Sequence, residues 1–202
     1  MTKDCIIYDF ETLSQKPTGV VVCTAALRFN ENRYLSDNPY VYQELVDSSE
    51  FIKFSIREQV EMYGRGIQKS AIEWWKNQPK DAQQLLEPSD VDRPLADIIP
   101  FFENLIGDSS QIDKVYTRGN NFDPIFMDSI LENLNSKSLY GWWLIRDTRS
   151  MIEGLSFGAN IHNKFMVPGL DDQFIAHDPR HDIAMDVMRM QHIVRLLNEP
   201  EV

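Results

Sequence analysis

Two acidic residues follow an apolar, strand-like segment near the N-terminus. Residues 5–8 read Cys-Ile-Ile-Tyr, and Asp9 and Glu11 come next with Phe10 between them. In a strand, the period of two places Asp9 and Glu11 on one face, with their Cα atoms about 7 Å apart. Asp is uncommon in strands, and a buried carboxylate is costly unless it is paired or binds a metal. The spacing therefore indicates either a metal-binding pair or a strand that simply ends in solvent.

Two further groups of chemically useful residues fall at predicted helix starts. Asp123 precedes a proline in mid-chain, where the helix dipole alone would favour an acidic side chain. His177, Asp178 and Asp182 lie at the start of the last predicted helix, where Asp178 suits the N-cap and Pro179 the first helical position. Taken singly, each group is explained at least as well by an exposed, charged helix start as by chemistry.

The order of these residues along the chain is more specific than any one of them. An Asp-x-Glu pair on the first strand, a lone Asp in mid-chain and a His-x4-Asp pair at the last helix resemble the DEDD superfamily of 3′–5′ exonucleases, in its histidine-containing branch (DEDDh). Within that branch the chain resembles the phage exonuclease A family over most of its length. The segments that carry this resemblance are residues 9–12, 69–70, 72–78, 118–119, 122–125, 176–178 and 181–182. Residues 136–163 match the family less well.

The resemblance implies a ribonuclease-H-like fold and release of nucleoside 5′-monophosphates from DNA 3′ ends. It also implies two divalent metal ions, and four carboxylate ligands suit Mg²⁺ or Mn²⁺. Asp9 would bridge both ions. Glu11 and Asp182 would complete one site, and Asp123 would support the other. His177 would be the general base for the attacking water, since an ordinary histidine pKa of about 6.5 suits that role at neutral pH.

Weaker expectations concern contacts with the substrate. Thr12 and Leu13 follow the acidic strand, and similar enzymes contact the terminal base at this position. Trp74 and Trp75 are adjacent, so on a helix they point about 100° apart. We expect one in the core, and Trp74 is the candidate for stacking on a base. The remaining candidates are Arg118, Asn121 and Arg149, with a surface ion pair as an equal alternative for the two arginines.

The other histidines are expected outside the site. His162, His181 and His192 have no place in the set that the resemblance implies, and we expect them on the surface.

The elements that must position these residues begin with three predicted strands. Residues 5–11 and 20–29 are apolar and are separated by a Pro-Thr-Gly turn, and residues 40–46 alternate in the manner of a third strand. The first 50 residues therefore predict an antiparallel meander.

Helices dominate the rest of the chain. Ser55 and Ser70 each precede a glutamate by three residues, which predicts two capped helices, the second ended or kinked at Pro79. A third helix is predicted from residues 92–94 to 105, with a kink or a late start at Pro100. A short strand at 115–117, a helix from about 122 and a last helix at 179–198 follow. The predicted fold is α/β: a mixed central sheet with an N-terminal antiparallel meander, flanked by helices.

Composition sets limits on the class of protein. The 202 residues suit a single domain spanning 1–202, and 20 basic against 31 acidic residues give a net charge of −11. Such a charge argues against a protein that coats nucleic acid, but not against an enzyme that holds a nucleic-acid end through metal ions.

We expect no membrane span, reduced thiols at Cys5 and Cys23, and a cytoplasmic location, that of the host bacterium if the chain is phage-encoded. The sequence does not predict an oligomeric state.

Three functions stay open at this point. An exodeoxyribonuclease is favoured by the family that the chain resembles. An exoribonuclease or oligoribonuclease of the same superfamily is the alternative, because the catalytic residues do not select the sugar. A non-catalytic nucleic-acid-binding protein that retains the fold is the third.

Overall fold

A mixed five-stranded sheet forms the centre of the protein. The computed structural model describes residues 3–157 and 161–198. Strands β1, β2 and β3 pair antiparallel, whereas β4 and β5 run parallel to β1, and the spatial order is β3-β2-β1-β4-β5. The strands are β1 (Asp4–Thr12), β2 (Val21–Phe29), β3 (Glu50–Lys53), β4 (Ile112–Thr117) and β5 (Ile145–Asp147). The predicted mixed sheet with an antiparallel N-terminal part is confirmed.

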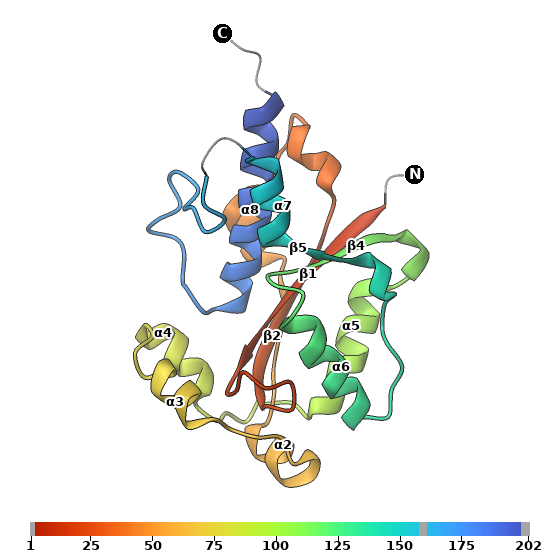
Figure 1. Ribbon diagram of the computed structural model, residues 1–202, viewed down its shortest axis with the longest axis vertical. Coiled ribbons are helices and arrows are strands. Elements are labelled where there is room, and N and C mark those ends of the chain that lie inside the picture. The colour runs from red at the N-terminus through yellow and green to blue at the C-terminus, as the bar shows by residue number, and fades with distance from the viewer. Residues whose placement is uncertain (1–2, 158–160, 199–202) are drawn as a thin grey trace.

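Helices cover both faces of this sheet (Figure 1). Helices α1, α7 and α8 pack over one face, and α5 and α6 pack over the other. Helices α2, α3 and α4 lie beyond the end of the sheet at which β1 finishes (Figure 1). The helices are α1 (Tyr42–Asp47), α2 (Ile56–Tyr63), α3 (Lys69–Trp75), α4 (Lys80–Gln83), α5 (Ile98–Ile106), α6 (Asp123–Asn133), α7 (Thr148–Leu155) and α8 (Pro179–Asn198). Among the helices of these described residues, none is long and apolar enough to cross a membrane.

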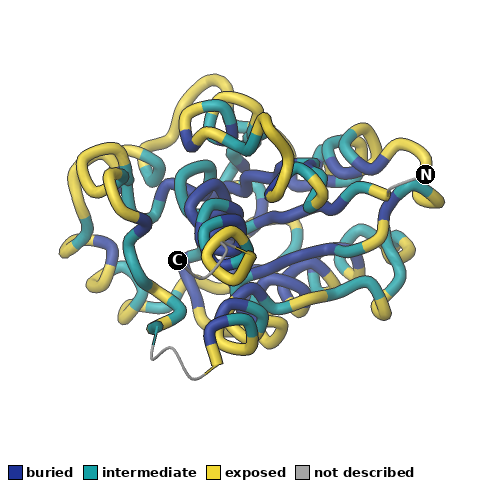
Figure 2. Tube along the Cα trace, turned by 90° about the horizontal axis from the view of Figure 1, so that it is seen from above, coloured by how far each residue is buried: buried dark blue, intermediate teal, exposed yellow. Residues whose placement is uncertain are grey.

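The central strand β1 is mostly buried, with neighbours on both faces. Figure 2 shows buried segments, drawn dark blue, in the interior of the molecule and exposed ones around it. Cys5 and Ile7 belong to the apolar cluster under α8, whereas Tyr8 belongs to the cluster under α5 and α6. The predicted alternation is therefore confirmed. It places Asp9 and Glu11 on the α8 face, just beyond the apolar part of the strand. Cys5 on β1 and Cys23 on β2 are buried free thiols, as expected.

The third predicted strand, residues 40–46, is wrong. Residues 42–47 form helix α1, and the strand that pairs with β2 follows at Glu50–Lys53. Tyr42 and Leu45 are the buried residues of α1, three positions apart, so one helical turn buries both against α8. The alternation of residues 40–46 is compatible with a strand, but burial of both side chains against α8 stabilises the helix instead.

Most of the other boundaries agree with the sequence. Ser55 caps α2 and accepts a hydrogen bond from the backbone N–H of Glu58. Helix α5 begins late, at Ile98, so that Pro100 lies in its first turn, where no helical partner is lost. The expected cap at Ser70 is wrong, because α3 begins at Lys69 and its N-cap is Gln68, two residues before Ser70.

Candidate active site

The site forms where β1 extends beyond its parallel neighbour. The last paired residues of β1 and β4 are Ile7 and Tyr116, so the backbone of β1 has no strand partner on this side beyond that point. There the N–H of Phe10 donates to Oδ1 of Asp123 at 3.1 Å. Asp123 is the first residue of α6 and is 2% exposed. The carboxylate therefore takes the place of a strand partner and is held beside Asp9.

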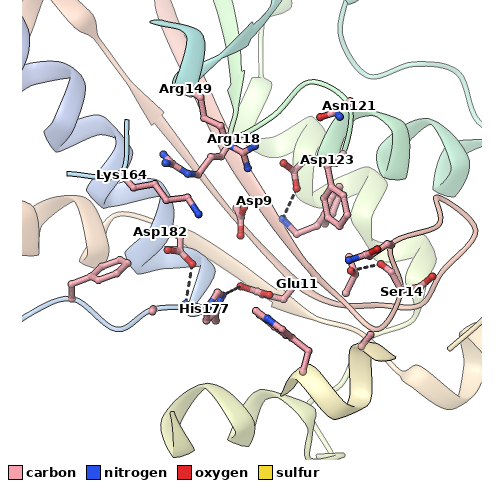
Figure 3. A pocket seen from close by; sticks show the side chains of 18 of the residues that line it. Asp9, Glu11, Ser14, Arg118, Asn121, Asp123, Arg149, Lys164, His177 and Asp182 are labelled. Carbon is pink, nitrogen blue, oxygen red and sulfur yellow. Dashed lines mark hydrogen bonds and ion pairs between the residues drawn. The ribbon is translucent and has the colours of Figure 1, made fainter. Parts of the chain in front are cut away.

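The start of α8 brings the other half of the site (Figure 3). The backbone N–H of His177 donates to Oδ2 of Asp182 at 3.0 Å, and Nδ1 of His177 lies 3.9 Å from Oε1 of Glu11. These three residues each offer one ligand atom within 4.8 Å of the others. As predicted, Asp178 caps the helix, since its Oδ1 accepts from the backbone N–H of Arg180 at 3.0 Å.

His177 has a strained backbone and an aromatic neighbour. Its φ of 66° lies in the left-handed region that residues with a Cβ rarely adopt. The ring of Trp74 packs edge-on against the imidazole, with the centroids 4.6 Å apart. Trp75 is buried, and its indole N–H donates to the carbonyl of Thr12 at 3.0 Å. Helix α3 thus ties the strand that carries the acids to the loop that carries His177.

The four predicted metal ligands and the predicted general base share one cavity of about 850 Å³. They are Asp9, Glu11, Asp123, His177 and Asp182. The structure therefore brings together all the residues that the sequence order singled out, from β1, α6 and the start of α8 (Figure 3).

The electrostatics of the cavity favour a bound cation. Burial is the main cause that raises the pKa of Asp9, and the neighbouring Asp123 and Glu11 raise it further. The pKa of Glu11 is likewise raised by burial and by Asp182. Burial also raises the pKa of Asp123 and that of Asp182 to about 7. Carboxylates that cannot all ionise without a counter-charge, and that offer oxygen ligands, fit a divalent metal ion.

His177 is shifted in the opposite direction. Burial, followed by the nearby ammonium of Lys164, lowers the pKa of His177 below its ordinary value. The imidazole is therefore neutral at neutral pH, which leaves a ring nitrogen free to accept a proton.

The predicted substrate contacts divide into two groups. Thr12, Trp74 and Asn121 line the cavity, and Trp74 is 44% exposed. Leu13 does not belong with them: its side chain is 3% exposed and packs in a small apolar cluster with Trp75. The bulge between Glu11 and Thr12 changes the alternation at this point.

Arg118 lines the cavity but is already engaged. Its guanidinium forms an ion pair with Asp186 of α8, which is 1% exposed. The alternative of an ion pair is thus correct for Arg118, although the pair is buried rather than on the surface. Arg149 also lines the cavity.

The other histidines lie outside the cavity lining, and their surroundings differ. His162 is exposed, as expected. His181 is half-buried and shares a 2.8 Å hydrogen bond with the hydroxyl of Tyr42. His192 packs against the ring of Phe165. His181 and His192 are therefore both partly buried, and His181 meets Tyr42 because α1 folds as a helix against α8.

Sequence reasoning missed three charged residues of the site: Lys164, Asp186 and Arg189. Lys164 and Arg189 line the cavity, and Asp186 lies directly behind it. Asp186 and Arg189 are both buried on the last helix, whereas charged residues on a helix are ordinarily expected to face solvent. No signal exists for Lys164, because its loop has no helical or strand period.

The fold and the acidic cavity define a ribonuclease-H-like nuclease. Residues 4–185 match the family described as the 3′–5′ exoribonuclease Rv2179c-like domain. The chain belongs to this family of 3′–5′ exonucleases.

Two kinds of relative accompany the family match. The chain is 32% identical over 206 aligned positions to an exodeoxyribonuclease of Enterobacteria phage T4, covering 94% of this chain and 88% of the relative. Its fold is similar to the zinc-bound form of the E. coli ExoI–ssDNA complex, with a TM-score of 0.61, 13% identity and 98% coverage of this chain. An E. coli exonuclease I complex with a 5cy-dT13 oligonucleotide gives a TM-score of 0.59 at 15% identity and 96% coverage. The chain spans 42% and 41% of the length of these two exonuclease I chains.

Proposed function

We propose that this protein is a divalent-metal-dependent exodeoxyribonuclease that removes nucleoside 5′-monophosphates from DNA 3′ ends. The observation that carries this proposal is the convergence of four carboxylates and His177 in one cavity. Buried ionised carboxylates destabilise a fold unless a counter-charge binds them, so this arrangement favours a bound cation.

The proposed metal ligands are Asp9, Glu11, Asp123 and Asp182. Their oxygen donors suit two Mg²⁺ or Mn²⁺ ions, which when bound would supply a nucleophilic water and stabilise the leaving 3′ oxygen. The chain itself holds these donors in place. The N–H of Phe10 fixes Asp123, and the N–H of His177 fixes Asp182.

His177 is the proposed general base. A neutral imidazole accepts the proton of the attacking water at a ring nitrogen, and the lowered pKa of His177 keeps it in that form at neutral pH. The edge contact with Trp74 restricts the ring. The exposed part of Trp74 remains available to stack on a terminal base, and Thr12, Arg118 and Asn121 are the other proposed substrate neighbours.

DNA is the favoured substrate because the phage relative, whose name is exodeoxyribonuclease, is similar to this protein over 94% of the chain. An exoribonuclease is the second candidate, because the matching family is described as one. A non-catalytic binding protein is disfavoured, since it would have no need of the buried acids and the neutral histidine.

The test compares single strands of DNA and RNA with the same sequence and a 5′ label. With Mg²⁺ or Mn²⁺, we expect stepwise shortening of the DNA, slower shortening of the RNA and no reaction in EDTA. Faster shortening of the RNA would make the second candidate correct. Binding of both strands without any shortening would support the non-catalytic protein.

A further inference from the structure

A buried carboxylate with two arginine partners lies behind the proposed active site. Asp186 follows Asp182 by one turn of α8 and is 1% exposed. It accepts hydrogen bonds from the guanidinium of Arg118, from Nη1 of Arg189 at 2.8 Å and from Oγ1 of Thr148 at 2.5 Å. We call Arg118, Asp186 and Arg189 the buried triad. Buried charges of this kind are costly to desolvate, and the pairing of Asp186 with both arginines offsets part of that cost.

The two arginines of the buried triad use their other N–H groups to hold one loop. Nη2 of Arg118 donates to the backbone carbonyl and to Oδ1 of Asn163, each at 3.1 Å. Nε of Arg189 donates to the backbone carbonyl of Phe165 at 2.8 Å. The single residue between these two anchored positions is Lys164. Its backbone is therefore fixed on both sides by guanidiniums that share one buried carboxylate.

The side chain of Lys164 points into the cavity. Figure 3 shows its ammonium directed towards the space between Asp9 and Asp182. Arg118 and Arg189 line the same cavity but are ion-paired with Asp186. Among the described residues, no ion pair involves Lys164, which is exposed to solvent. Lys164 is thus a cation that is held firmly at its backbone and remains available at its charged end.

We propose that Lys164 contacts a non-bridging oxygen of the scissile phosphate, the one that leaves with the 3′-terminal nucleotide. The buried triad positions Lys164 for this contact. This inference rests on the proposed function, because it assigns a contact within the same site. An ammonium at this point would offset negative charge on the phosphoryl oxygens, which is the contribution that fixed cations make in phosphoryl transfer. Asp186 acts through Lys164 and is a positioning residue, and the two arginines transmit its effect to the loop.

The first test separates phosphate binding from catalysis. Thymidine 5′-monophosphate is a product that the enzyme does not cleave further, so its binding can be measured by calorimetry with Mg²⁺ present. We expect Lys164→Gln to weaken this binding about tenfold and Lys164→Arg to restore most of it. Binding of thymidine, which lacks the phosphate, should not change. Lys137→Gln is the matched control, because Lys137 is exposed and does not line the cavity.

Activity on a single-stranded 3′ end provides the second readout. Lys164→Gln should lower kcat/KM by about 10²-fold, as loss of one fixed charge-stabilising group does. If Lys164→Gln matches the wild type in both thymidine monophosphate binding and activity, the inference is wrong. If the wild-type protein neither cleaves strands nor binds the monophosphate, it is the proposed function that fails.

The third test concerns the buried triad. Asp186→Asn should lower kcat/KM in the wild-type background but have little further effect in Lys164→Gln, because both changes remove the same contact. If Asp186→Asn does not fold, Asn163→Ala replaces it. This change removes one acceptor of Arg118 and the hydrogen bond that the Asn163 amide donates to Glu153. It should show the same non-additivity with a smaller effect. Equal effects in both backgrounds would assign the buried triad a structural role only and overturn its positioning role.

Discussion

His177 and His181 lie four residues apart and have different surroundings. His177 lies in the cavity beside Glu11 and Asp182, whereas His181 is hydrogen-bonded to Tyr42 under α1. Their spacing alone does not say which of them faces the acids. The helix cap at Asp178 decides it, because it leaves His177 in the loop before α8.

Exchanging each histidine for alanine should separate these roles. His177→Ala should lower kcat by roughly 10² to 10⁴ and leave the metal-induced rise in Tm nearly unchanged, because the carboxylate ligands remain. His181→Ala should retain kcat but lower the free energy of unfolding by about 1 kcal/mol, since a partly buried hydrogen bond is lost. Steady-state kinetics and thermal melts with and without Mn²⁺ measure both effects. A dead His181→Ala beside a fully active His177→Ala would contradict these roles.

At the scale of single residues, the sequence predicts the acids and the base better than their neighbours. Asp9 and Glu11 follow from strand alternation, and Asp123 and Asp182 lie at recognisable helix starts. Lys164 has no such signature, because its position depends on hydrogen bonds from distant arginines. Long-range anchoring of an irregular loop leaves no periodic pattern in the sequence.

Helix α3 joins the packing of the fold to the site. Trp75 fills an apolar cluster and bonds to the backbone of β1, whereas its neighbour Trp74 faces the cavity. Adjacent tryptophans on a helix predict that only one is buried, but only the packing of α3 on β1 shows which one. The alternation at residues 40–46 likewise could not reveal that a helical turn buries Tyr42 and Leu45.

The two tryptophans of α3 should respond differently to truncation. Trp75→Ala should lower the free energy of unfolding by about 3–5 kcal/mol, because it leaves a cavity and an unpaired carbonyl. Trp74→Ala should cost less than about 1 kcal/mol and should raise KM for single strands by losing a stacking surface, worth about 1–3 kcal/mol. Urea unfolding and steady-state kinetics test the pair. An unchanged KM in Trp74→Ala would argue against stacking.

We propose that residues 1–202 form a single domain. Strand β2 contributes to all three apolar clusters and β1 to two of them, so that these clusters meet at the same sheet. Urea unfolding followed by tryptophan fluorescence and by far-UV circular dichroism should therefore give one coincident transition. Two separated transitions would indicate independent units.

The acidic cavity should couple stability, pH and metal. Folding raises the pKa of Asp123 and Asp182 from 3.8 to about 7, so the folded protein without metal binds protons more tightly than the unfolded chain. The resulting stabilisation is present below about pH 4 and is lost as the pH rises towards 7. The Tm of the metal-free protein should fall across this window. Saturating Mg²⁺ should reverse the fall, because the ion binds the ionised carboxylates of the folded state. A Tm that rises with pH in EDTA would contradict this coupling.

The most direct test of the central claim uses a matched pair of aspartates on α6. Asp123 is buried in the cavity, whereas Asp128 is exposed and does not line it. The rate at which a 5′-labelled single-stranded DNA loses nucleotides from its 3′ end is measured with Mg²⁺ for Asp123→Asn and Asp128→Asn. The account predicts stepwise shortening by Asp128→Asn at the wild-type rate and a loss of at least about 10²-fold for Asp123→Asn. Equal rates for the two variants would contradict the assignment of this cavity as the active site.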